Sequence, residues 1–312
     1  MGTPEFAVAS LDKLVSNGCN IVAVITAPDK QAGRGMQLQQ SAVKKYAVEK
    51  GLHILQPEKL KNISFLEELK ALNADVQCVV AFRMLPEVVW NMPAMGTVNV
   101  HGSILPQYRG AAPINWAIIN GEKYTGVTTF KLQQEIDTGN ILLADKIKIE
   151  EDDNAGTVHD KLKELGANLL LKTIIGLADG ILKEMPQPLT INPPVGGQAL
   201  ELSTLQHAPK LFNETGNIDW TKKVEELYNL IRGLSPYPVA HTKLNGKILK
   251  IYKAEKIIEQ PAIEPGTYKT DEKSFLQFAC SNGYINILSL QIEGKRRMEI
   301  KDFLRGYHFE NK

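Results

Sequence analysis

Along the first half of the chain, short and continuously apolar runs alternate with stretches whose apolar residues recur at helical spacing. The short runs have the character of buried strands, and the longer stretches have the pattern of amphipathic helices. The predicted strands are Asn20–Ala27, Leu52–Leu55, Val76–Phe82, Met95–Val98 and Gly126–Leu132, and the predicted helices are Thr3–Asn17, Ser41–Lys50, Ser64–Leu72 and Asn154–Gly180. This alternation predicts an α/β fold with a Rossmann-like, largely parallel sheet, whose ligands bind beyond the carboxyl ends of the strands.

The last third of the chain has a different pattern. After a predicted helix over Lys222–Gly233, short strands follow one another closely between turn residues, which is typical of a small β-barrel. The predicted strands are Lys247–Lys253, Gly266–Thr270, Gln277–Ala279 and Tyr284–Gln291. Residues 185–197 are rich in Pro and Gly, as linkers are. We therefore predict a first domain over residues 1–184, a linker over 185–206 and a second domain over 207–312.

Composition agrees with two globular domains. The chain has 312 residues, of which 43% are hydrophobic and 23% charged, enough for a sizeable core. No apolar run approaches the roughly 20 residues of a membrane span. Three widely spaced cysteines indicate a reducing compartment, so we expect a cytoplasmic protein, with a monomer as the simplest assembly.

Charge is divided unevenly along the chain. From His207 onward there are 17 Lys and Arg against 13 Asp and Glu, whereas the remainder carries 19 against 22. A mildly basic C-terminal part on an acidic remainder is expected of a module that docks on nucleic acid.

Two stretches carry the candidate chemistry, because each places polar side chains after a predicted strand. Asn99 and His101 follow Met95–Val98, and their spacing of two residues places them on one face of an extended chain. Asp137 follows Gly126–Leu132. A carboxylate beside an imidazole favours the protonated ring, and an amide can donate to an oxyanion. Neither a nucleophile elbow nor metal-ligand spacing accompanies them, which favours acyl transfer between two bound substrates without a metal.

Asn99-Val-His-Gly-Ser-Ile-Leu-Pro106 and Glu135-Ile-Asp-Thr-Gly139 resemble the signature of the folate-dependent formyltransferases. Gln107–Asn120, His207–Leu211 and Gly216–Trp220 are similar to the branch of that family that acts on methionyl-tRNA. The resemblance covers almost the whole chain. It implies a Rossmann-like catalytic domain followed by an OB-like β-barrel that binds tRNA.

The resemblance also implies a reaction and the residues that serve it. The donor would be 10-formyltetrahydrofolate, and the acceptor the α-amino group of methionyl initiator tRNA. Asn99 and His101 would stabilise the oxyanion of the tetrahedral intermediate, and Asp137 would help to remove the ammonium proton. The residues expected to bind the folate are Arg83, Met84, Leu85, Ser103, Leu105 and Pro106. Most relatives have Tyr-Gly where this chain has Phe82-Arg83.

Five basic residues are expected to contact tRNA, Arg34 by the same resemblance and the other four by their charge and position, and each has a plainer interpretation. Arg34 lies in a glycine-containing loop that could be a simple connection. Lys210 could be an ordinary surface lysine. Lys295, Arg296 and Arg297 form the sharpest basic cluster, which could neutralise phosphates or carry solvated charge on a turn.

The start of the chain raises a separate expectation. Relatives begin with a short apolar strand that leads into Gly2-Thr3-Pro4. We therefore expect a central strand to precede Met1, since the two neighbouring strands would otherwise lack backbone partners.

Two other functions stay open at this point. One is formyl transfer to a small amine such as an amino-sugar nucleotide, because the catalytic trio is shared across the superfamily. The other is an RNA-binding module on an inactive α/β domain, which the intact Asn99, His101 and Asp137 disfavour.

Overall fold

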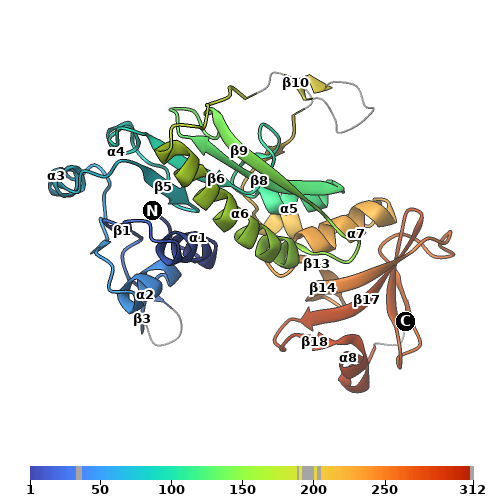
Figure 1. The fold of residues 1–312 in the computed structure, drawn as a ribbon. Helices are drawn as coiled ribbons and strands as arrows, with labels where there is room; N and C mark the ends of the chain where they lie inside the picture. The colour runs from blue at the N-terminus through green and yellow to red at the C-terminus, as the bar shows by residue number, and fades with distance from the viewer. Residues whose placement is uncertain (33–36, 188–189, 192–199, 202–204, 310–312) are drawn as a thin grey trace. The chain divides into compact units, whose positions relative to one another are not determined.

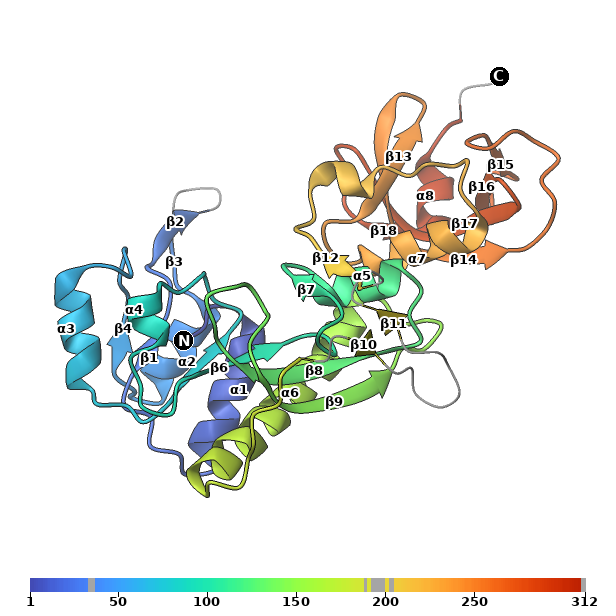
Figure 2. The ribbon, with the colours of Figure 1, turned by 90° about the horizontal axis from the view of Figure 1, so that it is seen from above.

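The structure is a computed structural model that describes residues 1–32, 37–187, 190–191, 200–201 and 205–309 (Figures 1 and 2). It divides into two compact units. The first comprises Met1–Gly110, Thr125–Ile147 and His159–His207, and the second comprises Ala111–Tyr124, Lys148–Val158 and Ala208–Lys312. Two short segments from within residues 1–184 thus belong with the second unit, and the domain limits of the sequence analysis stay a prediction.

The five predicted helices agree with the structure to within about two residues, whereas α4, α5 and α8 were not predicted. The N-cap residue of α1 is Pro4 rather than Thr3. Pro4 has an extended backbone and no side-chain hydrogen bond caps the helix. Asn154 caps α6, since its Oδ1 accepts from the backbone N–H of Gly156 and Thr157. The helices are α1 (Glu5–Ser16), α2 (Ala42–Glu49), α3 (Ile63–Ala71), α4 (Glu87–Trp90), α5 (Pro113–Ile119), α6 (Ala155–Ala178), α7 (Val224–Gly233) and α8 (Ile300–Gly306), with a 3-10 turn η2 (Asn213–Gly216).

The strands fall into several short pairs and two larger sheets. They are β1 (Val24–Ile25), β2 (Lys30–Ala32), β3 (Gln37–Gln39), β4 (Ile54–Leu55), β5 (Gln77–Val80), β6 (Thr97–His101), β7 (Arg109–Gly110), β8 (Tyr124–Lys131), β9 (Ile141–Lys148), β10 (Thr190–Ile191), β11 (Leu200–Glu201), β12 (His207–Ala208), β13 (Ala240–Leu244), β14 (Lys247–Ile257), β15 (Tyr268–Thr270), β16 (Leu276–Cys280), β17 (Gly283–Ile292) and β18 (Met298–Glu299).

Four strands form the main sheet of the first unit, in the order β5-β6-β8-β9. β5 and β6 run parallel, whereas β6 and β8 are antiparallel, with His101 opposite Thr128. The separate pair of β1 and β4 is also parallel. α6 lies along this sheet (Figure 1), and its Thr173 Oγ1 is 2.8 Å from Thr129 Oγ1 of β8. The predicted α/β class with parallel strands is confirmed.

Met1 and Gly2 lie between β1 and β5. The backbone N–H of Gly2 donates to Ile25 O at 3.0 Å, and the N–H of Val80 donates to Met1 O at 3.0 Å. A cavity of about 530 Å³ continues from there between the segments that contain β1 and β5.

Two strands are shorter than predicted, and the cavity borders the first of them. Of the strand predicted over Asn20–Ala27, only Val24 and Ile25 form a ladder. Of the strand predicted over Val76–Phe82, residues 77–80 do. The cavity, rather than a paired backbone, borders residues 20–23, and a strand needs a partner for its N–H and C=O groups.

The second unit contains a six-stranded antiparallel sheet in the order β13-β14-β17-β16-β15, with β18 paired to β17. The sheet curls into a half-barrel (Figure 2), and a bulge near Lys253 interrupts the register of β14. Side chains of α7 and α8 fill its core, in which Trp220 stacks on Phe278 with 4.8 Å between ring centroids. The predicted succession of short strands is confirmed.

Candidate active site

Two of the three predicted catalytic residues lie on β6. The strand predicted to end at Val98 continues to His101, so Asn99 and His101 both project from the sheet, on one face. His101 is 7% exposed and Asn99 is half-buried. The Asn99 side chain makes no hydrogen bond to any residue that the structure describes. Its amide is therefore available to a ligand.

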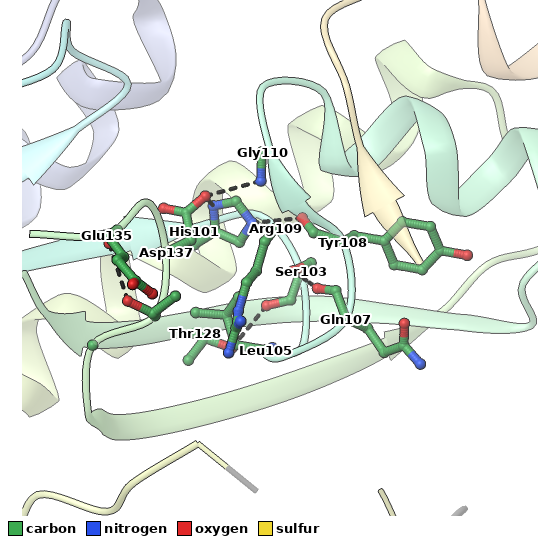
Figure 3. A network of polar contacts seen from close by, with 12 residues as sticks. His101, Ser103, Leu105, Gln107, Tyr108, Arg109, Gly110, Thr128, Glu135 and Asp137 are labelled. Atoms are coloured by element: carbon green, nitrogen blue, oxygen red, sulfur yellow. Dashed lines mark hydrogen bonds and ion pairs between the residues drawn. The ribbon is translucent and has the colours of Figure 1, made fainter. Parts of the chain in front are cut away.

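His101 lies between two oxygen acceptors (Figure 3). Its Nε2 is 2.9 Å from Tyr108 O, and its Nδ1 is 3.7 Å from Asp137 Oδ2. A backbone carbonyl can only accept, so Nε2 carries a proton in this arrangement. Nδ1 faces the carboxylate from just beyond hydrogen-bond distance. The two contacts set the orientation of a ring that is otherwise enclosed by protein.

Asp137 reaches His101 from the loop between β8 and β9. Its side chain is 13% exposed, and its Oδ2 accepts the backbone N–H of Gly110 at 2.9 Å. Its backbone is left-handed, with φ at +55°. Asp tolerates this region better than most residues, and such conformations cluster at functional sites. The loop conformation therefore determines where the carboxylate lies.

Arg109 lies beside the same carboxylate and is half-buried. Burial lowers the pKa of its guanidinium, and the carboxylates of Asp137 and Glu135 act against that effect. Its Nε donates to Gln187 Oε1 at 3.0 Å, and its Nη2 donates to the same oxygen. The sequence analysis did not identify Gln187, because it falls in the Pro-rich segment assigned to the linker. A polar residue between two prolines was the one signal available, and it did not indicate which loop the side chain contacts.

The residues predicted to bind folate lie in two places. Arg83, Met84 and Leu85 line a groove of about 1020 Å³ together with residues 58–61, and the lining of this groove includes neither His101 nor Asp137. Arg83 donates from Nη1 to Glu58 O at 2.7 Å, so its guanidinium is tied to the groove wall. Met84 is 75% exposed, whereas Leu85 belongs to the core.

The other three predicted folate residues, Ser103, Leu105 and Pro106, are buried in the loop that follows β6. Ser103 Oγ donates to Gln107 O at 2.6 Å (Figure 3). Thr128 Oγ1 donates to Ser103 O at 2.7 Å and accepts the N–H of Leu105 at 3.0 Å. These contacts fix the path of the loop, and direct contact with folate stays a prediction.

Of the residues predicted to contact tRNA, Arg34 lies outside the described residues. Lys210 is exposed, and its Nζ lies 5.7 Å from the ring centroid of Phe212. Phe212 is 57% exposed. A cation beside an exposed ring leaves the ring face and the charge accessible to a ligand.

The basic cluster at residues 295–297 belongs to the turn between β17 and β18, and all three residues are exposed. The guanidinium of Arg297 lies 4.5 Å from the ring centroid of Tyr252, and its Nε donates to Ser289 Oγ at 3.0 Å. Arg297 is therefore held by the sheet. No ion pair is formed by Lys295 or Arg296 with any described residue.

Over the part of the chain that the structure describes, no group of three or more His, Cys, Asp or Glu side chains is arranged to hold a metal ion. None of the helices described is both long enough and apolar enough to cross a membrane. Cys19, Cys78 and Cys280 are free, and burial raises the pKa of Cys78 to about 11, so that side chain is a neutral thiol.

Comparison with known proteins gives consistent matches at both ends of the chain. The family model described as formyl transferase matches residues 1–174, and the model described as formyl transferase, C-terminal domain, matches residues 210–308. A methionyl-tRNA formyltransferase of Parabacteroides distasonis is 53% identical and covers 98% of this chain and 94% of its own. One of Bacteroides fragilis is 50% identical and covers 99% of this chain and 94% of its own.

A solved structure provides a match in fold. It is an N-formyltransferase of Helicobacter canadensis in complex with folinic acid and dTDP-3-aminofucose. It superposes with a TM-score of 0.67 at 21% identity, and the match covers 92% of this chain and 96% of that one.

Proposed function

The chain belongs to the formyl transferase family, and we propose that it transfers the formyl group of 10-formyltetrahydrofolate to the α-amino group of methionyl initiator tRNA. The observation that carries the reaction is the buried imidazole of His101, held beside the Asp137 carboxylate and next to an Asn99 amide with no partner among the described residues. The tRNA acceptor is favoured because the methionyl-tRNA formyltransferases are about 50% identical over nearly the full length, whereas the sugar-linked enzyme is 21% identical.

In the proposed reaction the neutral amine of the methionyl group attacks the formyl carbon, and a C–N bond forms. The carbonyl oxygen becomes an oxyanion, to which the Asn99 amide donates together with the Nδ1–H of protonated His101, because Nε2 is bonded to Tyr108 O and Nδ1 lies 3.7 Å from Asp137 Oδ2. The ammonium proton leaves the attacking nitrogen, and Asp137 accepts it directly or through water. The oxyanion then re-forms the carbonyl as the bond from the formyl carbon to N10 breaks, and the proton that Asp137 accepted passes to N10 of the departing tetrahydrofolate.

Preorganisation is the main contribution that the structure supports. Tyr108 O and Asp137 hold the imidazole at both ring nitrogens, and the N–H of Gly110 holds the carboxylate. Donors that are already oriented cost no reorganisation when charge develops. The remaining lowering of the activation barrier comes from holding the two substrates in the correct relative position.

We propose that the groove at Arg83, Met84 and Leu85 and the loop that contains Ser103, Leu105 and Pro106 bind opposite ends of the folate. Arg83 uses its donors on backbone carbonyls of residues 57 and 58, so it shapes the groove wall. The exposed side chains of Met84 and Val88 offer apolar surface there to an aromatic ring.

The reaction is tested directly with the whole chain. We expect it to form formyl-methionyl-tRNA from 10-formyltetrahydrofolate and charged initiator tRNA, measured by acid-gel electrophoresis. A parallel assay replaces tRNA with an amino-sugar nucleotide. Turnover that is confined to the sugar would overturn the proposed acceptor, and a folded chain without turnover on either acceptor would overturn the reaction.

The basic cluster supports a second expected result. The double variant Lys295→Ala/Arg296→Ala should raise KM for tRNA and leave kcat unchanged, because the residues are exposed and lie on a turn of the second unit. If both contact phosphates, the slope of log KM against log salt should fall by about 1 per residue. The matched control is Lys301→Ala/Arg305→Ala on α8, which removes the same charge from exposed positions. Equal effects of both pairs would show that only net charge matters.

Location and assembly complete the proposal. We propose a cytoplasmic monomer, since the three cysteines are free thiols and all three proposed catalytic residues come from one unit of one chain. Light scattering that gives a mass near 34.6 kDa supports the monomer, and twice that mass contradicts it.

A further inference from the structure

Gln187 is bonded at both ends of its side-chain amide to groups around Asp137. Its Nε2 donates to Asp137 O at 2.7 Å and to Gly139 O at 3.0 Å. Its Oε1 accepts from Nε and Nη2 of Arg109. One half-buried glutamine therefore uses both amide hydrogens and its oxygen within the site.

The chemistry of the partners determines which way the amide points. Backbone carbonyls can only accept and a guanidinium can only donate. The Gln187 nitrogen must therefore face Asp137 and Gly139, and its oxygen must face Arg109. Neither a carboxylate nor an apolar side chain at this position could satisfy both sides.

The segment that carries Gln187 is attached to the first unit just before it. Met185 and Ile141 exchange backbone hydrogen bonds of 2.7 and 2.9 Å. Glu184 lies 2.7 Å from Lys131 Nζ and accepts from Asn140 Nδ2 at 3.1 Å. Its bonds to Lys131 and Asn140 hold the pKa of Glu184 below its usual range, so it is charged at neutral pH. We call residues 184–187 the clamp segment.

Together these bonds close a ring around the catalytic carboxylate. Asp137 Oδ2 is bonded to the N–H of Gly110, Gly110 is covalently joined to Arg109, Arg109 donates to Gln187, and Gln187 donates to Asp137 O. The side chain and the main chain of Asp137 are thus tied to the same two-residue stretch. A residue in the left-handed region holds its conformation only when its surroundings determine it.

We propose that Gln187 is a positioning residue that keeps the Asp137 carboxylate against the His101 ring. The kinetic part of this inference rests on the proposed formyl transfer, whereas the geometric part does not. Without Gln187, the half-buried Arg109 guanidinium loses an acceptor and two carbonyls lose the Gln187 donor. The loop is then free to move, and a displacement of about 1 Å at a reacting group costs on the order of 10²-fold in rate.

The test compares Gln187→Met, which keeps the length but not the bonds, and Gln187→Glu, which keeps an acceptor for Arg109 and places an oxygen against two carbonyls. For both we expect kcat to fall by about 10-fold to 10²-fold, with KM for folate and tRNA within about twofold. The control is Gln56→Met, since Gln56 Nε2 also donates to two oxygens, Ala27 O and Asp29 Oδ1, away from His101.

A second measurement does not depend on turnover. With ¹⁵N-labelled histidine, the ring signals of His101 are assigned among the six histidines by their absence in His101→Ala. We expect these signals to shift in both Gln187 variants and to stay unchanged in Gln56→Met. Unchanged signals, or an unchanged kcat in an active enzyme, would overturn the positioning role. If the wild type formylates neither acceptor, the proposed function fails, and the ring signals alone decide the role of Gln187.

Discussion

His101→Ala is expected to lower kcat by at least about 10² to 10³-fold, because it removes a donor to the oxyanion. The imidazole is enclosed and faces Asp137 and Tyr108 O, so water cannot readily replace it. Steady-state formylation at saturating tRNA and folate measures the loss. Asn99→Ala should produce a loss of the same order with a smaller effect on stability, since the Asn99 side chain bonds to none of the described residues.

The controls for this variant separate chemistry from folding. Removing the ring removes the hydrogen bond from Nε2 to Tyr108 O, and loss of a buried hydrogen bond costs about 1–3 kcal/mol, so thermal unfolding is measured alongside. His101→Gln retains a donor for that carbonyl. The matched control is His53→Ala, whose ring is 52% exposed and 3.9 Å from Glu68. Near-normal turnover of a folded His101→Ala would contradict the assigned role.

Gly139→Ala is expected to impair both stability and turnover, although it adds one methyl group. A Cβ at this position would lie 1.7 Å from Lys131 O and 2.9 Å from Lys131 C, so two backbones would have to separate. The same two backbone segments are joined by the hydrogen bond from the Lys131 N–H to Asn140 O, which is 3.0 Å long and would be stretched if they separated. Overpacking of this kind costs about 1–3 kcal/mol, occasionally more. At about 2–4 °C per kcal/mol, we expect the melting temperature to fall by several degrees.

Turnover should fall in the same variant because Gly139 lies two residues from Asp137 and its carbonyl accepts from Gln187. Gly306→Ala is the matched control. A Cβ there meets nothing within 4 Å, so its melting temperature should stay equal or rise slightly. If Gly139→Ala has the same melting temperature and turnover as Gly306→Ala, the loop does not depend on the close approach of Gly139 to the Lys131 backbone.

The elements that the sequence predicted well are those whose signal is local. α6, for example, spans Ala155–Ala178 where Asn154–Gly180 was predicted, because its apolar positions keep one period over many turns. The strands were less well predicted, since a strand depends on a partner that lies elsewhere in the chain. The segment Asn20–Ala27 has the apolar character of a buried strand, yet a cavity borders its first half.

The candidate site also has features with a local sequence signal and features that depend on distant partners. His101 and Asp137 were expected to act together, and the structure places them 3.7 Å apart. Their roles, like those assigned to Asn99 and the folate-binding residues, stay predictions. Gln187 could not be found, because a hydrogen bond across about fifty residues leaves no periodicity or local motif in a single sequence.

The sequence by itself determined five of the helices, the family and the residue types available for formyl transfer, because these follow from local periodicity and short motifs. Only the tertiary structure decided that the His101 ring lies between Tyr108 O and Asp137, that Ser103 holds a loop, and that the clamp segment closes on the catalytic loop. The contacts of Asp137 and Gln187 join residues far apart in the chain. Their geometry is set when buried polar groups find partners on packing, and that requirement acts only in the folded state.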